Sequence, residues 1–197
     1  KSSYKILVTV VNDGSTDGTQ DILEQISNRR ELDIDIEIIR QANKGFSGAR
    51  NAALKCIKGE YIMFLDSDDV LPENAIDELL NNAHMYNAEI VQGSWYSFSD
   101  TAKEKHIISA GGMLNDTKGY ISGYPWGKIY KYSVLEHFQF PDGYWFEDTP
   151  ISFILAAMPY KIVSIEAIVY GYRLNSDGIT SKAIYSDKAL DSYWITE

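Results

Sequence analysis

The sequence predicts an α/β fold in which a mostly parallel, doubly wound sheet is flanked by helices. In the first half of the chain, apolar runs that suit buried strands alternate with segments of helical spacing, which is the pattern of a parallel sheet. The run at 61–65 is followed at once by Asp66, Asp68 and Asp69. Ligands of open α/β sheets bind at the carboxyl ends of strands, and gathered acidic side chains repel one another unless a cation joins them. This strand end therefore predicts a metal that receives a phosphorylated ligand.

The elements of the first half follow from local signals. The predicted strands cover residues 6–10, 34–39 and 61–65, and the predicted helices follow a turn at 11–17, span about 47–58 and start near Pro72. Ser15, Thr16 or Asp17 can cap the first helix, and Gly59 is placed to end the second. Pro72 suits the first position of the third helix.

The second half of the chain is patterned less regularly. We expect a strand at 90–98, a polar loop at 100–105, a short helix at 133–137, an aromatic loop at 140–146, an apolar helix at 151–158, strands at 162–165 and 168–172, and a closing helix after a polar segment. The fold prediction therefore depends mainly on the first half.

The junction between Val10 and Val11 is unusual. It joins two strand-like segments directly, whereas a strand–helix–strand unit needs roughly 30 residues. We therefore expect that residues are missing from the sequence between these two positions.

The composition excludes several classes of protein. Because Asp and Glu number 28 against 18 Lys and Arg, the formal net charge is −10, which argues against a nucleic acid as partner. A single cysteine, Cys56, excludes an internal disulfide and fits a reducing compartment. No apolar run approaches the ~18 residues of a membrane span. We therefore expect a cytoplasmic protein, leave peripheral association with the inner face of the membrane open, and make no prediction of the oligomeric state.

Four short motifs occur in order along the chain. They are Val11-Asn12-Asp13-Gly14-Ser15-Thr16-Asp17, Asn43-Lys44-Gly45 with Ala49-Arg50-Asn51, Asp66-Ser67-Asp68-Asp69, and Phe146-Glu147-Asp148. One short acidic motif is a weak signal, but this ordered set resembles the family 2 inverting glycosyltransferases over about residues 6–173. The resemblance implies the GT-A fold of nucleotide-diphospho-sugar transferases. It also implies a single domain, 1–197, with a nucleotide-sugar-binding half at 1–98 and an acceptor-binding half at 99–197.

The resemblance assigns a nucleotide and metal site to the first half. It implies that Asp13 contacts the base, that Gly45 and Arg50 lie at the nucleotide, and that Asp66 bonds the ribose or a metal-bound water. Asp68, together with Asp66, would hold Mg²⁺ or Mn²⁺ against the diphosphate of the donor. The implied donor is a nucleotide sugar, most often a UDP-sugar, and the implied acceptor is a saccharide or lipid-linked saccharide.

Catalysis is assigned to the second half. A sugar hydroxyl is a poor nucleophile at neutral pH, so a carboxylate must take its proton during the attack, and inversion in one displacement needs only one such base. The resemblance implies that Asp148, with Glu147 beside it, is this base. By looser similarity, Trp126, Lys128 and Trp145 would lie near the acceptor or the donor sugar.

Two other functions account for part of the same residues. Residues 65–71 also resemble the nucleophile loop of haloacid-dehalogenase-type phosphatases, in which Asp66 would be phosphorylated, but that function leaves Asp13 and Arg50 without a role. A non-catalytic carbohydrate-binding module of the same fold is the second alternative. Taken singly, Asp13 also suits a tight turn and Trp126 a packed core.

Overall fold

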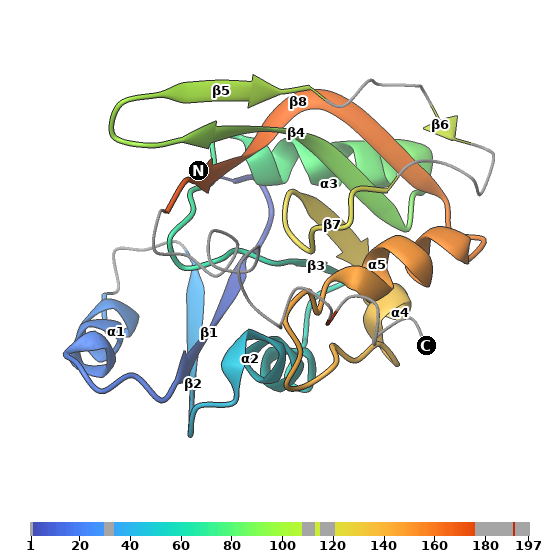
Figure 1. The fold of residues 1–197 in the computed structure, drawn as a ribbon. Helices are drawn as coiled ribbons and strands as arrows, with labels where there is room; N and C mark the ends of the chain where they lie inside the picture. Colours follow the sequence, from blue (N-terminus) through green and yellow to red (C-terminus); the bar gives the residue numbers. More distant parts are fainter. Residues whose placement is uncertain (1, 30–33, 108–112, 115–120, 176–190, 192–197) are drawn as a thin grey trace.

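The computed structural model describes residues 2–29, 34–107, 113–114, 121–175 and 191, and Figure 1 shows how their elements are arranged. The strands are β1 (Leu7–Asp13), β2 (Asp35–Gln41), β3 (Tyr61–Met63), β4 (Ile90–Phe98), β5 (Lys103–His106), β6 (Met113–Leu114), β7 (Lys128–Lys131) and β8 (Ile162–Arg173). The helices are α1 (Thr19–Ser27), α2 (Gly45–Leu54), α3 (Ala75–Tyr86), α4 (Tyr132–Leu135), α5 (Thr149–Phe153) and the 3₁₀ turn η1 (Leu155–Ala157). The predicted α/β class is therefore confirmed.

The smaller sheet consists of β1 and β2, which pair in parallel from Leu7–Asp35 to Asp13–Gln41. Strand β1 runs through Val10 and Val11 without a change of register, so the two apolar segments form one strand. That residues are missing from the sequence between Val10 and Val11 stays a prediction. Sequencing of the coding DNA across this junction would test it. In Figure 1 this sheet lies between α1 and α2, to one side of the larger sheet.

The larger sheet has the strand order β3-β7-β4-β8-β6, with β5 paired to β4. Strands β4 and β8 are parallel, whereas β3–β7, β4–β7, β4–β5 and β6–β8 are antiparallel, so this sheet is mixed. Helix α3 covers one face, where its Leu79 and Ala83 pack against Val91, Ile129 and Val169. The apolar stripe predicted for this helix is thus buried against the sheet.

A second apolar core places residues 66–69, called the acidic loop below, near the aromatic loop at 140–146. Phe64, at the end of β3, packs with Ile90, Tyr130, Phe140 and Ile151. The Phe64 ring meets the Tyr130 and Phe140 rings edge-on, at centroid distances of 6.0 and 5.4 Å. Because Phe140 begins the segment that leads to α5, this core fixes that segment beside the carboxyl end of β3.

Two predictions in the second half are wrong about strands. The predicted polar loop at 100–105 contains most of β5, an exposed edge strand whose charged side chains conceal its strand character. The predicted strands at 162–165 and 168–172 form one strand, β8, because a register shift opposite Gly93 and Ser94 absorbs the polar interruption.

Helix boundaries also differ. Helix α2 starts and ends earlier than predicted. Helix α3 begins only after Asn74, whose φ of 62° is left-handed, so Pro72 precedes the helix. Gly18 precedes α1, and Asp17 accepts a hydrogen bond from the Thr19 N–H (3.0 Å) without being the cap itself. The short helix appears as α4 and the apolar helix as α5 with η1, while the predicted closing helix lies outside the described residues.

None of the helices in the described ranges combines the length and the apolar character that crossing a bilayer requires.

Candidate functional site

Asp66, Asp68 and Asp69 lie at the carboxyl end of β3, as predicted, with Phe64 and Leu65 between them and the last residue of the strand. The backbone of Phe64 forms a parallel bridge with Trp126 just before them. The Asp69 N–H then donates to the Asp66 carbonyl (3.1 Å) and closes a turn. The side chain of Asp66 is 34% exposed and Asp68 is exposed, so the loop presents two carboxylates to solvent.

Arg50 joins this loop to the segment before α5. Its Nη2 lies 2.9 Å from Oδ1 of Asp66, and its Nη1 forms an ion pair with Oε1 of Glu147. The guanidinium also lies over the ring of Phe140, 5.4 Å from its centroid. Burial by itself would lower the pKa of Arg50, but the two carboxylates outweigh it and raise that pKa. The predicted site residue Arg50 therefore connects two others, Asp66 and Glu147, which come from distant segments of the chain.

The loop that precedes Glu147 is fixed by α2 as well. Asn51 donates from Nδ2 to the Phe140 carbonyl (2.8 Å) and accepts from the Phe140 N–H (2.9 Å). Its Nδ2 also reaches Oδ1 of Asp142 (3.2 Å). Helix α2 thus supplies Arg50 to the carboxylates and Asn51 to the backbone of the same loop. Asn51 is part of a predicted motif, but its role in holding this loop could not be predicted from the sequence.

Asp148 is half-buried beside this ion pair. Burial raises the pKa of its carboxyl above the ordinary value of 3.8, while the charges of Arg50 and Lys128 act to lower it and that of Asp66 to raise it. The neighbouring Glu147 is more deeply buried, and burial likewise raises its pKa. Because the carboxylate of Glu147 is engaged in the ion pair with Arg50, the carboxylate of Asp148 is the better placed of the two to accept a proton.

The backbone before these acids is strained. Phe146 adopts φ 62°, a left-handed conformation that a bulky side chain rarely takes. Its carbonyl is held by the Thr149 N–H (3.0 Å) and the Thr149 hydroxyl (2.7 Å). Strain of this kind persists where the surroundings impose it and is common at functional sites.

Lys128 is fully buried, although lysine is rarely so. Its Nζ donates to Ser122 Oγ (2.6 Å), to the Ser122 carbonyl (3.0 Å), and to the carbonyls of Tyr124 and Trp126. Burial lowers the pKa of Lys128 to about 7, and the charge of Asp148 opposes that shift. The ammonium group thus holds the preceding loop by hydrogen bonds, and its charge interacts with the carboxylate of Asp148.

The two predicted tryptophans have different environments. Trp126 is 5% exposed and stacks on Tyr124 and Tyr170, with centroids 4.5 and 4.7 Å away. Trp145 is half-buried, and its backbone N–H donates to Oδ2 of Asp191 (2.7 Å). These contacts give Trp126 a packing role, and a direct contact of Trp126, Lys128 or Trp145 with a sugar stays a prediction.

Tyr170 is a residue of this site that the sequence did not single out. Its hydroxyl contacts the acidic loop at Asp66 and Asp69, and burial raises its pKa, so the hydroxyl stays protonated. Burial also raises the pKa of Asp69, against the effect of its hydrogen bonds from Arg173 and Tyr170. A tyrosine in an apolar strand carries no sequence signal that separates it from an ordinary core residue.

Asp13 and Gly45 lie on the side of the smaller sheet. Oδ1 of Asp13 accepts hydrogen bonds from Nε2 of Gln41 (2.7 Å) and the Lys44 N–H (2.9 Å). Gly45 follows with φ 72°, a conformation that favours glycine. Gln41 and Lys44 also line a groove of about 240 Å³ against α2. Helix α2 therefore connects the surroundings of Asp13 at its start with the acidic loop at Arg50.

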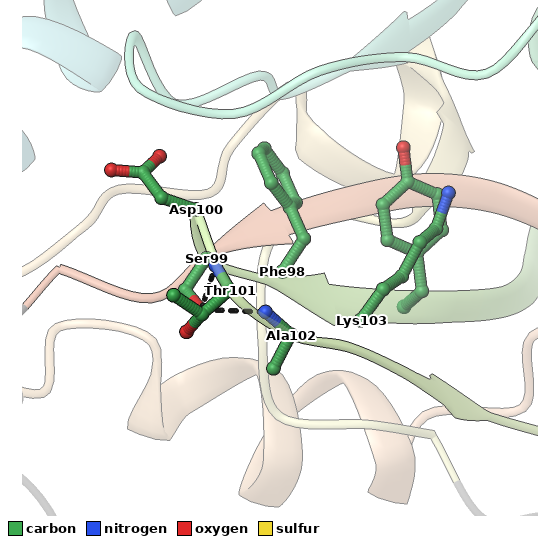
Figure 2. Close-up of a pocket in the computed structure, with 7 residues that line it drawn as sticks. Phe98, Ser99, Asp100, Thr101, Ala102 and Lys103 are labelled. Atoms are coloured by element: carbon green, nitrogen blue, oxygen red, sulfur yellow. Dashed lines mark hydrogen bonds between the residues drawn. The ribbon is translucent and has the colours of Figure 1, made fainter.

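A second hollow lies at the turn between β4 and β5. Its volume is about 390 Å³, and Tyr96, Phe98 and residues 99–103 line it. Figure 2 shows these side chains around the turn, where Ser99 Oγ accepts from the Ala102 N–H (3.2 Å). None of the residues 66–69 lines either of these two hollows.

Comparison with known proteins supplies independent findings. Residues 2–143 match the family model described as Glycosyl transferase family 2. The chain is 30% identical to the glycosyltransferase GlyA of Streptococcus pneumoniae serotype 4 over 196 residues, which are 90% of this chain and 28% of that protein. It is 38% identical, over 55% of its length and 40% of the relative, to the Escherichia coli protein WfaP, a UDP-Glc:alpha-D-GlcNAc-diphosphoundecaprenol beta-1,3-glucosyltransferase.

Solved structures show a shared fold. Residues 1–349 of S. aureus TarS, in complex with UDP-GlcNAc, superpose with a TM-score of 0.68 at 21% identity, over 88% of this chain and 51% of that one. The chain spans less than two thirds of the length of each of these proteins.

Proposed function

Because the chain belongs to glycosyltransferase family 2 and has the GT-A fold, we propose that it transfers a sugar, with inversion, from a nucleotide-diphospho-sugar to a hydroxyl group. The observation that carries this proposal is the arrangement around Arg50. One buried guanidinium connects Asp66 of the acidic loop with Glu147, next to Asp148. This arrangement supports a site in which the proposed donor-binding loop and the segment with the proposed base act together.

The acidic loop fits a divalent metal such as Mg²⁺ or Mn²⁺. Within the described ranges, no three His, Cys, Asp or Glu side chains are grouped so that they could hold an ion by themselves. These metals need only one or two protein carboxylates when phosphate oxygens and water fill the remaining positions. Asp68 is exposed. Arg50 binds Oδ1 of Asp66, and the same carboxylate has a second oxygen, Oδ2, as a candidate ligand. When bound, the ion would neutralise negative charge on the departing diphosphate.

The proposed chemistry requires one base and a fixed site. Asp148 accepts the proton of the acceptor hydroxyl as its oxygen attacks the anomeric carbon and the bond to the diphosphate breaks. A raised pKa makes Asp148 a better proton acceptor than an ordinary carboxylate. Arg50 holds Glu147 and Asp66 in place, and Lys128 in its protonated form adds a positive charge that acts on Asp148.

We also propose the class of the donor and of the acceptor. A UDP-sugar is supported by the UDP-GlcNAc bound to TarS, and a glycan or lipid-linked acceptor by the name of WfaP. We also propose that residues 1–98 bind the nucleotide sugar and 99–197 the acceptor, in the cytoplasm. Titration of the chain with a panel of nucleotide sugars in Mn²⁺ tests the donor: tighter binding of UDP-sugars than of GDP-sugars is expected.

The alternatives are separated by simple assays. A phosphatase using Asp66 is not favoured, because the family match is to glycosyltransferases and Arg50 occupies an oxygen of that carboxylate. Such an enzyme would also hydrolyse a generic aryl phosphate. A non-catalytic module would bind a nucleotide sugar without ever releasing UDP from it.

The Asp68→Ala variant tests the metal site. Loss of a direct metal ligand should weaken UDP binding in Mn²⁺ by at least about 10-fold, the lower limit typical of residues that only support ligands. Binding measured by calorimetry in EDTA should not change. Equal affinities of the variant and the wild-type protein in Mn²⁺ would exclude Asp68 as a ligand.

The pH profile tests the surroundings of the base. Because Asp148 must be ionised and burial raises its pKa, kcat/KM should fall toward acidic pH at a higher pH than an ordinary carboxyl would give. The Lys128→Met variant removes a positive charge that lowers this pKa, so the acidic limb should move further up in pH. Lys131→Met, on the same strand, is the matched control and should leave the limb in place. A limb that does not move in Lys128→Met would contradict the electrostatic role.

A further inference from the structure

Tyr170 is at the centre of a set of contacts that attaches strand β8 to the acidic loop. Its side chain is fully buried. Its hydroxyl accepts a hydrogen bond from the Asp66 N–H (3.1 Å) and donates one to Oδ2 of Asp69 (2.7 Å). One phenolic oxygen thus holds both the first and the last acid of the loop.

The backbone of β8 strengthens this attachment. Val70 and Gly171 exchange two backbone hydrogen bonds, of 3.0 and 2.9 Å. The Arg173 N–H donates to Oδ1 of Asp69 (2.7 Å), and its Nε donates to the Asp68 carbonyl (2.9 Å). Both carboxylate oxygens of Asp69 are therefore occupied by donors from β8, whereas the carboxylate of Asp68 is left exposed.

The ring of Tyr170 holds a second segment. It stacks on Trp126 with centroids 4.7 Å apart and planes at 12°. The Trp126 carbonyl accepts a hydrogen bond from Nζ of Lys128 (3.4 Å), whose charge acts on Asp148. The side chain of Tyr170 therefore lies between the acidic loop and the segment of Trp126 and Lys128, and contacts both the loop and Trp126.

We propose that Tyr170 is a positioning residue for the metal site: its hydroxyl fixes the loop so that Asp69 is an internal anchor and Asp68 faces the ion. This inference rests on the proposed metal site at Asp66 and Asp68. It assigns an anchoring role to Asp69, for which the sequence predicted none, and separates that role from the one of the exposed Asp68.

Calorimetric titration of the full chain with UDP, in Mn²⁺ and in EDTA, tests the assignment. Tyr170→Phe keeps the stacked ring and removes the hydroxyl, and we expect about 10- to 100-fold weaker binding in Mn²⁺, as for partners that support ligands, with no change in EDTA. Tyr172→Phe is the matched control, since that ring also stacks on Trp126 (5.5 Å, 16°), and it should bind like the wild-type protein.

Two substitutions of Asp69 separate an anchor from a ligand. Asp69→Asn keeps an oxygen that accepts from the Arg173 N–H and presents an amide that can donate to the Tyr170 hydroxyl, while the charge is lost, so an anchor should bind UDP in Mn²⁺ nearly as the wild-type protein does. Asp69→Ala should also weaken UDP binding in Mn²⁺, and the double variant should be weaker than either by less than the sum of the two effects, because the two changes share the hydrogen bond between Tyr170 and Asp69 while each also loses one of its own. An Asp69→Asn variant as weak as Asp69→Ala would overturn the inference.

Hydrogen exchange of the backbone amides needs no metal and separates this inference from the proposed function. Tyr170→Phe should speed exchange at residues 66–70 and leave the β1–β2 sheet unchanged. If UDP bound the wild-type protein equally in Mn²⁺ and EDTA, the proposed metal site would be wrong, and exchange would still decide whether Tyr170 fixes the loop. Unchanged exchange at 66–70 would overturn the positioning role.

Discussion

Replacement of Asp148 by Asn is expected to lower turnover by about 100- to 10,000-fold, the range typical of a lost general base. Asparagine has the shape of aspartate but cannot take the proton of the acceptor hydroxyl. Asp148 is half-buried, and the charges of Arg50 and Lys128 act on its carboxylate. The measurement is release of UDP from the sugar donor that binding identifies, at saturating donor and acceptor.

Binding measurements distinguish chemistry from folding in this variant. UDP affinity in Mn²⁺ should match that of the wild-type protein, because Asp148 is not assigned to the nucleotide or the ion. Asp21→Asn, on the exposed face of α1, is the matched control and should keep full turnover. Turnover of Asp148→Asn within about 10-fold of wild type would fall below that range and remove Asp148 as base.

Glu147→Gln gives the contrast within the same pair. Glutamine keeps an oxygen for the hydrogen bond from Arg50, so the arrangement of the site should survive while one buried charge is lost. We therefore expect a smaller loss of turnover than in Asp148→Asn. A larger loss would transfer the role of base to Glu147, which the sequence named beside Asp148.

The sequence predicted most of the chemical groups because they lie in short local motifs. Asp66 and Asp68 follow an apolar run, and Glu147 and Asp148 precede an apolar helix, so each is visible without knowledge of the fold. Arg50 was named for the nucleotide, and its ion pairs with two distant carboxylates depend on the packing of α2 against both loops.

Some features of the structure have no local sequence signal. The burial of Lys128 is one of them: lysine is ordinarily a surface residue, and this one is buried because the carbonyls of the preceding loop turn toward its ammonium group. The charged residues of β5 concealed a strand that forms only against β4, where His106 stacks on Trp95 at 3.7 Å. Such contacts have no local signature.

Replacement of Arg50 by Met is expected to destabilise the fold by about 3–5 kcal/mol, the usual cost of removing one partner from a buried ion pair. Methionine retains an apolar stem that can pack on Phe46 and Phe140, which Arg50 contacts now. The charge of Glu147, whose side chain is 9% exposed, would be left without its cation. Urea denaturation measures the loss, and the exposed Arg40→Met is the matched control.

The pH dependence of this loss identifies its cause. In Arg50→Met the pKa of Glu147 should rise further, since burial already raises it above 4.5 and Arg50 is the group that opposes the shift. The folded variant then binds a proton that the unfolded chain releases above about pH 4.5, so its stability should fall as pH rises through the folded pKa. Adding Glu147→Gln should recover part of the loss at neutral pH, because no buried charge remains. A loss no larger than that of Arg40→Met, or one without this pH dependence, would show that Arg50 does not hold the two segments together.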